Sequence, residues 1–265
     1  MEANVPLKMK HEIARMRPVC RAVAAVLEEL QHRIEPGITT RSIEEFCSRK
    51  LSSLGVEPAT GSVGNFPGKI CVSVNHVAAH GIPGELILNE NDILTVDIAG
   101  KMNGWHGDSA WTYISGQGTP EVRRLLKAAW NATIAGIRAA KAGGRLGDIG
   151  EAIEKTAAKY GCSIIANCVG HGIGRDLHEE PAVLPRGEKG TDRPIVPGMV
   201  FTVEPVVTLG TGDITDVKNG HEIHTADFSL SAQYEHTIAV FSDRTEILTQ
   251  TGMNGSKYLD FPPFF

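Results

Sequence analysis

Residues 93–114 read ILTVDIAGKMNGWHGDSAWTYI, and this stretch decides the fold because two apolar runs flank one tight turn. Asn103-Gly104 is a strong hairpin signal, since both positions of such a turn require positive φ. If these two residues form the turn, Asp97 pairs opposite Ala110. Asp97 and Asp108 then share one face of the hairpin as diagonal neighbours, with α-carbons about 7–8 Å apart. Because two buried carboxylates that converge repel one another, the hairpin predicts a bound cation between them.

The composition describes a folded chain without an obvious nucleic-acid or membrane partner. Its 265 residues fit one large domain or two small ones, and 42% of them are apolar, which excludes a disordered or collagen-like chain. The net charge is −5 and no basic block stands out, so nucleic acid is not expected as the main partner. No apolar run approaches the ~18 residues that span a bilayer. The first 17 residues lack the apolar centre of a signal peptide, and five cysteines without a CxxC pair favour the reducing cytoplasm.

Hydrophobic periodicity predicts four helices and a larger number of short strands. Apolar residues recur at three- and four-residue steps over residues 7–32, which indicates an amphipathic helix. Further helices are predicted over residues 41–54, 119–142 and 148–161, the last with Asp148 and Glu151 as a capping box. Short β-branched or alternating runs predict strands over residues 71–77, 93–99, 109–115, 163–168, 199–205, 214–218, 222–226, 234–240 and 246–248.

The order of these elements repeats once along the chain. Each half carries two helices and then strands, so we expect an α+β fold. We predict a single domain over residues 1–265, with lobes over about residues 8–115 and 116–252 and a C-terminal tail over residues 253–265.

The second half offers three groups that match the two aspartates. Glu204 and Glu235 each interrupt a run that otherwise reads as a buried strand, and His171 lies among the glycines of residues 170–174. Four acids and one histidine form a mixed oxygen and nitrogen donor set. This set is too acidic for one structural zinc and suits two divalent ions that share carboxylates.

Five ordered motifs carry a resemblance to a known family. They are Val74-Asn75 through His80-Gly81-Ile82-Pro83, Val96-Asp97 through Gly107-Asp108-Ser109, Gly170-His171-Gly172-Ile173-Gly174 through His178-Glu179 and Pro181, Thr202-Val203-Glu204-Pro205, and Ser231-Ala232-Gln233-Tyr234-Glu235-His236-Thr237. With these motifs in this order, the chain resembles the type I methionine aminopeptidases from about Lys8 to Gly252.

The resemblance implies the pita-bread fold, in which two pseudo-symmetric lobes form a curved, mainly antiparallel sheet covered by helices. It implies a cytoplasmic metalloprotease, a hydrolase that removes the initiator methionine from peptides and nascent proteins. Two divalent metal ions would be its cofactors, with Mn, Fe, Co and Zn all open because oxygen and nitrogen donors accept each of them. A peptide or nascent-chain N-terminus would be its partner, the ribosome stays open as a second partner, and we expect no membrane partner and a monomer.

The same resemblance assigns roles to individual residues. The metal ligands would be Asp97, Asp108, His171, Glu204 and Glu235. Of these, Asp108 and Glu235 would bridge the two ions, and Glu204 would also move the proton of the attacking water. His80 would bind the substrate backbone and the leaving nitrogen, and His178 would bind the carbonyl oxygen where negative charge develops.

The pocket for the N-terminal side chain departs from the family pattern. Its lining would consist of Val63, Phe66, Cys71, Leu177 and His221. Family members usually carry aromatic residues at the positions of Val63, Leu177 and His221, and a tyrosine at that of Phe66. Because smaller side chains widen an apolar pocket and His221 adds a polar edge, a shifted N-terminal residue preference is a second hypothesis.

Two further alternatives come from the same fold. An X-Pro hydrolase usually carries a large extra N-terminal domain, for which the stretch before Asp97 is short. A non-catalytic peptide- or ribosome-binding relative usually loses metal ligands, whereas this sequence keeps all five. The run His221-Glu222-Ile223-His224 is one residue shorter than HExxH and lies on a predicted strand, where the two histidines face opposite ways, so we do not expect it to bind zinc.

Overall fold

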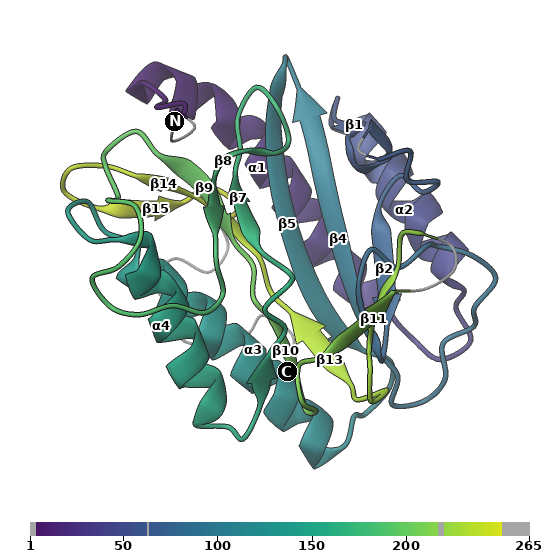
Figure 1. Cartoon of the computed structure of the whole chain (residues 1–265). Coiled ribbons are helices and arrows are strands. Elements are labelled where there is room, and N and C mark those ends of the chain that lie inside the picture. The colour runs from purple at the N-terminus through teal and green to yellow at the C-terminus, as the bar shows by residue number, and fades with distance from the viewer. Residues whose placement is uncertain (1–3, 63, 217–219, 251–265) are drawn as a thin grey trace.

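The computed structural model describes residues 4–62, 64–216 and 220–250 (Figure 1). Its helices are α1 (Lys10–Leu30), α2 (Thr40–Ser53), α3 (Pro120–Ala139) and α4 (Leu146–Ala158), with single 3-10 turns η1 (Gln31–Arg33) and η2 (Thr60–Ser62). The strands of the first half are β1 (Glu57–Pro58), β2 (Cys71–Val74), β3 (Val77–Ala79), β4 (Ile93–Met102) and β5 (Trp105–Ile114). Those of the second half are β6 (Ser163–Ile164), β7 (Gly170–Gly172), β8 (Glu179–Val183), β9 (Val200–Val203), β10 (Val206–Thr208), β11 (Ile214–Asp216), β12 (Ile223–Thr225), β13 (Ser231–Gln233), β14 (His236–Val240) and β15 (Thr245–Ile247).

The strands pair into small sheets that join distant parts of the chain. Their orders are β1-β4-β2 with β5 on the other side of β4, β13-β10-β6, β11-β12-β3, and β15-β14-β9-β7-β8. Every strand pair among the described residues is antiparallel. The predicted α+β class with a mainly antiparallel sheet is therefore confirmed. The division into two lobes stays a prediction.

The β4–β5 hairpin has the predicted register. Asn103 and Gly104 have φ of 51° and 75°, as the tight turn requires, and Asp97 lies opposite Ala110 while Ala99 lies opposite Asp108. Helix α1 packs against both strands and crosses behind them in Figure 1. Its buried side chains, such as Ile13, Met16 and Leu27, are those that recur at helical spacing. The hairpin is thus fixed from one side by α1, which leaves its other face for the second half of the chain.

The N-terminus of helix α4 differs from the predicted capping box. The helix begins at Leu146, so Asp148 is its third residue rather than its cap. The Asp148 carboxylate accepts hydrogen bonds from the Arg145 amide at 2.8 Å and from the Gly190 amide at 2.7 Å. The pKa of Asp148 is lowered because these two amides stabilise its charged form. The predicted pairing with Glu151 was wrong because Asp148 caps backward onto Arg145.

Several strands were predicted with wrong bounds or not at all. The predicted strand over residues 71–77 divides into β2 and β3, and that over residues 163–168 is reduced to β6. Strands β7 and β8 were missed because glycine flanks the first and Pro181 interrupts the second, and both residues are rare in strands. The end of the predicted strand over residues 214–218 and the tail over residues 253–265 lie outside the described residues.

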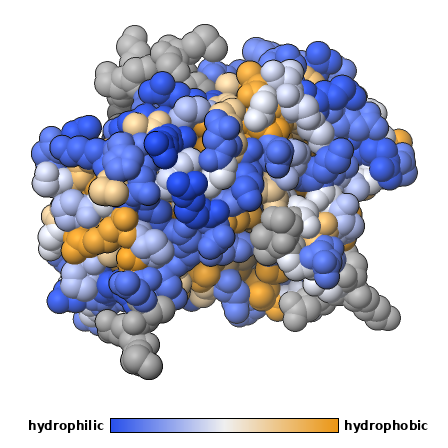
Figure 2. All heavy atoms as spheres, turned by 90° about the horizontal axis from the view of Figure 1, so that it is seen from above, coloured by the Kyte–Doolittle hydropathy of each residue, from blue (hydrophilic) through white to orange (hydrophobic). Residues whose placement is uncertain are grey.

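The interior is continuous between the two halves of the chain. One cluster of buried apolar side chains contains residues of α1, α3, β4 and β14, and the rings of Trp130 and Tyr234 meet edge to face at 5.3 Å. All five cysteines are free and buried. The face shown in Figure 2 is mostly hydrophilic, with apolar side chains in small groups. Within the described residues, no helix combines the length and apolar character that crossing a membrane requires.

A buried ion pair joins the N-terminal segment to the second half. The Lys8 ammonium pairs with the Glu179 carboxylate, and their side chains are only 5% and 7% exposed. The other Glu179 oxygen accepts hydrogen bonds from the amides of Arg175 and Asp176 at 2.8 and 3.2 Å. Glu179 therefore holds the segment that leads to His178.

Replacing Lys8 tests this ion pair. Lys8→Met leaves the Glu179 carboxylate buried without its cation, and we expect the free energy of unfolding to fall by about 3–5 kcal/mol in urea titrations. The matched control is Arg41→Met, which breaks the exposed ion pair with Glu85 and should cost less than about 1 kcal/mol. Equal, small losses for both variants would contradict the assignment.

Candidate metal centre and its flanking cavities

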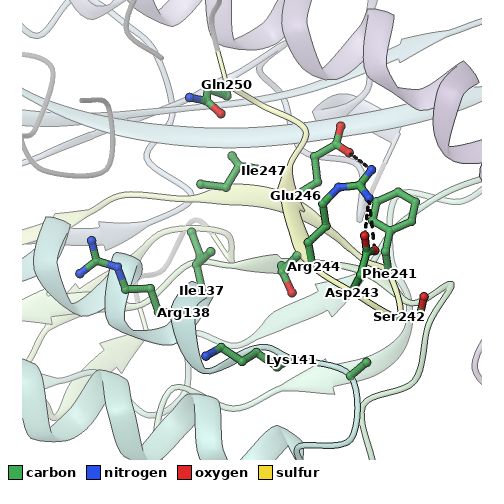
Figure 3. Close-up of a pocket in the computed structure, with 12 residues that line it drawn as sticks. Ile137, Arg138, Lys141, Phe241, Ser242, Asp243, Arg244, Glu246, Ile247 and Gln250 are labelled. Atoms are coloured by element: carbon green, nitrogen blue, oxygen red, sulfur yellow. Dashed lines mark hydrogen bonds and ion pairs between the residues drawn. The ribbon is translucent and has the colours of Figure 1, made fainter. Parts of the chain in front are cut away.

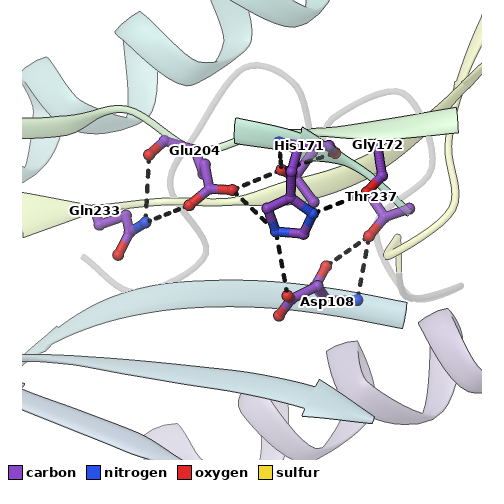
Figure 4. A network of polar contacts seen from close by, with 7 residues as sticks. Asp108, His171, Gly172, Glu204, Gln233 and Thr237 are labelled. Carbon is purple, nitrogen blue, oxygen red and sulfur yellow. Dashed lines mark hydrogen bonds and ion pairs between the residues drawn. The ribbon is translucent and has the colours of Figure 1, made fainter. Parts of the chain in front are cut away.

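The predicted metal ligands converge where the β4–β5 hairpin faces the strands of the second half, and Figure 4 shows Asp108, His171 and Glu204 among them. Asp108, His171 and Glu235 each present a ligand atom, and these atoms lie within 4.8 Å of one another. Glu204 joins them because its Oε1 lies 3.5 Å from His171 Nε2. Asp97 lines one cavity together with Asp108 and another together with His171 and Glu204, as the shared face of the hairpin predicts. The structure thus brings together all five side chains, which come from β4, β5, β7 and the two segments beside β9 and β14.

His171 is oriented to offer one nitrogen as a ligand. Its Nδ1 lies 3.0 Å from the Gly172 carbonyl oxygen, which can only accept, so Nδ1 carries the hydrogen. The lone pair of Nε2 then faces Asp108 Oδ2 at 3.8 Å and Glu204 Oε1 at 3.5 Å. Strand β7 can approach β8 this closely because residue 172 has no side chain: a Cβ there would lie 2.1 Å from the Glu180 carbonyl oxygen. The glycines around His171 therefore serve close backbone packing.

Glu204 is held by two neighbours that sequence reasoning missed. The Thr202 hydroxyl donates to Glu204 Oε1 at 2.6 Å, and the Gln233 amide donates to Glu204 Oε2 at 3.3 Å. Both residues lie inside the quoted motifs, each as a polar side chain on an otherwise apolar strand. That same signal singled out Glu204 and Glu235, so it could have found Thr202 and Gln233 as well.

The hairpin and the second half are joined by hydrogen bonds beside the ligands. The Asp108 amide donates to the Thr237 hydroxyl at 3.2 Å, and that hydroxyl donates to the Asp108 carbonyl at 2.8 Å. The Ser109 hydroxyl donates to the Glu235 carbonyl at 2.7 Å, and the Glu235 amide donates to the Ala110 carbonyl at 2.8 Å. The backbones of Asp108 and Glu235 are therefore fixed against each other.

The donor set fits divalent cations. Asp108 Oδ1 and Glu235 Oε1 are buried without a hydrogen-bond partner, which is costly for a carboxylate oxygen unless something positive binds it. Oxygen donors with one imidazole are the ligands that Mn, Fe, Co and Zn accept. Two buried carboxylate oxygens without partners, on residues that cluster with a neutral His171 nitrogen, therefore have the chemistry of a metal centre.

In the metal-free site, every acid is shifted toward its protonated form. Burial and the neighbouring carboxylates raise the pKa of Asp108 and Glu235 well above the usual range. Burial also raises the pKa of Asp97, and it raises that of Glu204 to about 8. Burial and the adjacent His178 lower the pKa of His171 to about 4. The site therefore holds protons in place of cations when no metal is bound.

Two cavities flank the acids and share three of their lining residues: His80, Asp97 and His178. The first cavity, of about 260 Å³, is also lined by Thr60, Gly64, Phe66, Cys71, Ala99, Asp108, Leu177, Gly220 and His221. The second, of about 310 Å³, is also lined by Ala79, Asn167, Cys168, Val169, His171, Glu204, Ile223 and Gln233. The acids therefore lie between two spaces that each have room for a side chain.

The first cavity contains the predicted pocket residues that the structure describes. The rings of Phe66 and His221 meet edge to face, with centroids 5.7 Å apart. Cys71 lies opposite Asp97 in the β2–β4 pair, and burial raises the pKa of its thiol, so it lines the cavity as a neutral group. Val63 lies outside the described residues. Thr60 and Ala99 were not predicted, because nothing in their local sequence marks them as lining residues.

His178 lies at the border between the cavities and the acids. Its ring meets that of His171 edge to face, with centroids 4.3 Å apart. Burial and the charge of neighbouring histidines lower its pKa, so the imidazole is neutral near pH 7. A neutral imidazole can donate one hydrogen bond to an oxygen in either cavity.

A larger cavity, of about 810 Å³, lies between the C-terminal end of α3 and the β14–β15 hairpin (Figure 3). Of the residues that line it in the described part of the chain, none belongs to the predicted site. Its acids are paired, because Arg244 contacts Asp243 and Glu246, and Glu246 also accepts hydrogen bonds from Arg17. These ion pairs are typical of a solvated surface and offer no converging ligand set.

Comparisons with known proteins find the same fold and sequence pattern. Residues 14–241 match metallopeptidase family M24. A methionine aminopeptidase of Rickettsia prowazekii is 36% identical over 262 residues, which is 98% of this chain and 100% of the relative. Methionine aminopeptidase 1 of Bacillus subtilis is 37% identical over 92% of this chain and 98% of its own length.

Solved structures agree with these sequence matches. The methionine aminopeptidase of Rickettsia prowazekii superposes with a TM-score of 0.92 over 93% of this chain and 100% of its own. A prolidase from Pyrococcus furiosus superposes with a TM-score of 0.75 at 19% identity, over 65% of its chain, and so shares the fold alone. The pita-bread fold expected from the resemblance is confirmed.

The metal-free protein should lose stability as the pH rises. Glu204 has a pKa of about 8 in the folded state against 4.5 for an ordinary glutamate, so folding favours its protonated form. That stabilisation is complete below pH 4.5 and is lost as the pH rises through 8. We expect the Tm of chelator-treated protein to fall over this interval, and to fall less steeply for Glu204→Gln, which cannot ionise. The measurement is thermal melting against pH, and identical slopes for both proteins would contradict the prediction.

Proposed function

This chain belongs to the methionine aminopeptidases of metallopeptidase family M24, and we propose that it uses two divalent cations to remove the initiator methionine from peptides and nascent proteins. The observation that carries the proposal is the cluster of four acids and one imidazole, with two orphaned carboxylate oxygens, between two cavities. A peptide N-terminus can place its first side chain in one cavity and its next residue in the other. We place this activity in the cytoplasm, on a monomer.

The cations would be held by the four acids and the one histidine of the cluster. Asp108 and Glu235 would be central to holding them, because each has a buried oxygen without a hydrogen-bond partner and both cluster with His171. When bound, the cations supply Lewis acidity, which acidifies water and polarises the scissile carbonyl. The positive charge of the cations would also replace the protons that the acids hold in the metal-free protein.

Glu204 is the group that moves a proton in this proposal. It lies in the second cavity, and the donors Thr202 and Gln233 hold its carboxylate in one orientation. A carboxylate held in one orientation beside the reacting water can accept a proton from it and return that proton to the leaving amine. Glu204 therefore acts first as a base and then as an acid.

Two histidines would bind the substrate on either side of the scissile bond. His178 is neutral, so it can donate a hydrogen bond to the carbonyl oxygen as negative charge develops there. His80 lines both cavities, which suits a residue that binds the substrate backbone and the leaving nitrogen. Each histidine would thus contact the scissile peptide bond from the cavity that it lines.

A panel of peptides with free N-termini tests the proposed activity. With Mn²⁺, Co²⁺ or Fe²⁺ present, we expect release of N-terminal methionine and no cleavage of an X-Pro peptide, measured by mass spectrometry. Glu204→Ala should lower kcat by about 10²–10⁴-fold, because it removes the proton carrier. Two bound metals without cleavage of any peptide would reject the proposal in favour of a binding protein.

Selectivity for methionine should depend on the first cavity. Leu177→Ala removes a side chain from its wall, and we expect the kcat/KM of a methionyl peptide relative to an alanyl peptide to fall by about tenfold. The matched control is Leu184→Ala, at an exposed leucine outside both cavities, which should leave this ratio unchanged. An unchanged ratio in Leu177→Ala would mean that the N-terminal side chain lies elsewhere.

A further inference from the structure

The segment from His221 to Ile223 passes between the two cavities. His221 lines the first cavity and Ile223 lines the second, while Ile223 also pairs with Ala79 in the β12–β3 ladder. The residue between them, Glu222, lies beside the segment that follows His80. One short stretch of the second half therefore touches both cavities and the histidine that lies between them.

The chain after His80 is held by side chains at three successive points. The Gly81 amide donates to the buried Ser73 hydroxyl at 3.0 Å, and the Gly84 amide donates to the Thr40 hydroxyl at 2.8 Å. Between these two points, the Ile82 amide donates to Glu222 Oε1 at 3.0 Å. Ser73 and Thr40 belong to the first half of the chain, so of these three acceptors only Glu222 links the His80 segment to the second half.

The backbone around His80 leaves little freedom for it to adjust. His80 has φ of 55°, in the left-handed region that most residues avoid, and a Cβ on residue 81 would lie 2.3 Å from the Val72 carbonyl oxygen. Such a conformation persists only where the surrounding contacts hold it. Removing one of those contacts should therefore move the imidazole of His80.

Glu222 is itself held in place by aromatic neighbours. Its Oε2 lies 3.5 Å from His224 Nε2, and the His224 ring meets the His76 ring edge to face at 5.0 Å. The carboxylate is mostly buried, so its bond to Ile82 competes little with water. These contacts direct one oxygen toward His224 and the other toward Ile82.

We propose that Glu222 is a positioning residue for His80: it accepts the Ile82 hydrogen bond and thereby fixes the His80 imidazole at the junction of the two cavities. This inference rests on the proposed function, because it takes His80 as a residue that contacts the substrate. Among the described lining residues of the two cavities Glu222 is absent, so it would act on the substrate through His80.

The experiment compares kcat and KM on a methionyl peptide for variants of the metal-loaded enzyme. Glu222→Ala should lower kcat by about tenfold or more with little change in KM, because small displacements of a reacting group cost rate rather than binding. Glu222→Gln keeps an acceptor oxygen for the Ile82 amide and should retain kcat within about twofold. Metal content should be unchanged in both, and an unchanged preference for methionyl over alanyl peptides would show that the His221 wall is intact.

A double-mutant cycle separates positioning from a general structural role. In a His80→Ala background, Glu222→Ala should cause no further loss of kcat, because the group that it positions is gone. Thr225→Val is the matched control: in strand β12, which follows Glu222, it removes the hydroxyl that donates to the Ser229 and His76 carbonyls, without touching Ile82. It should lower Tm while leaving kcat unchanged.

Several results would overturn the inference. These are full kcat in Glu222→Ala, an equal loss of kcat from Glu222→Ala with and without His80, or a folded Glu222→Gln as impaired as Glu222→Ala. If Glu222→Ala unfolds below the assay temperature, Glu222→Met supplies the same loss of the acceptor with a side chain of similar length. Full kcat in His80→Ala would overturn the role of His80 as well, whereas an absence of methionine release from the wild-type enzyme would overturn the proposed function.

Discussion

The repulsion among four buried carboxylates is the constraint on which the rest of this structure depends. In water all four acids would be ionised at neutral pH, but burial raises the pKa of each of them, and neighbouring carboxylates raise it further for Asp108, Glu204 and Glu235. Such a cluster persists only where protons or cations offset its charge. The Thr202 hydroxyl and the Gln233 amide donate to Glu204, which reduces the repulsion without cancelling it. Cation binding should therefore neutralise buried charge in the interior of the protein as well as supply its reaction site.

The same constraint explains how the two halves of the chain fit together. Asp97 and Asp108 come from one hairpin, whereas His171, Glu204 and Glu235 come from β7 and from the residues beside β9 and β14, far along the chain. The backbone bonds between Glu235 and Ala110, and between Asp108 and Thr237, align these strands on the face of the hairpin that α1 leaves open. Because the ligands exist as a set only after the halves have met, cation binding should favour the folded state.

The two histidines proposed to bind the substrate lie on two different segments beside the acids. His178 lies against His171, and the segment before it is held by the buried pair of Glu179 and Lys8. His80 lies on the opposite segment, which Ser73 and Glu222 hold. Each histidine is thus fixed by a side chain that does not contact the substrate. Preorganisation of this kind lets a hydrogen bond act on developing charge without first reorganising the site.

The sequence by itself determined those features that depend on interactions between residues near one another in the chain. The Asn103-Gly104 turn and the two-residue period of the strands placed Asp97 opposite Ala110, and apolar spacing placed α1. The ordered motifs also predicted five ligands, and the structure brings these side chains together. Only the tertiary structure decided the glycine-flanked β7, the donors Thr202 and Gln233, and the bond from Ile82 to Glu222, whose residues are 140 positions apart. Turn chemistry and side-chain period act over a few residues and can be read locally, whereas contacts between distant segments depend on how the whole chain packs.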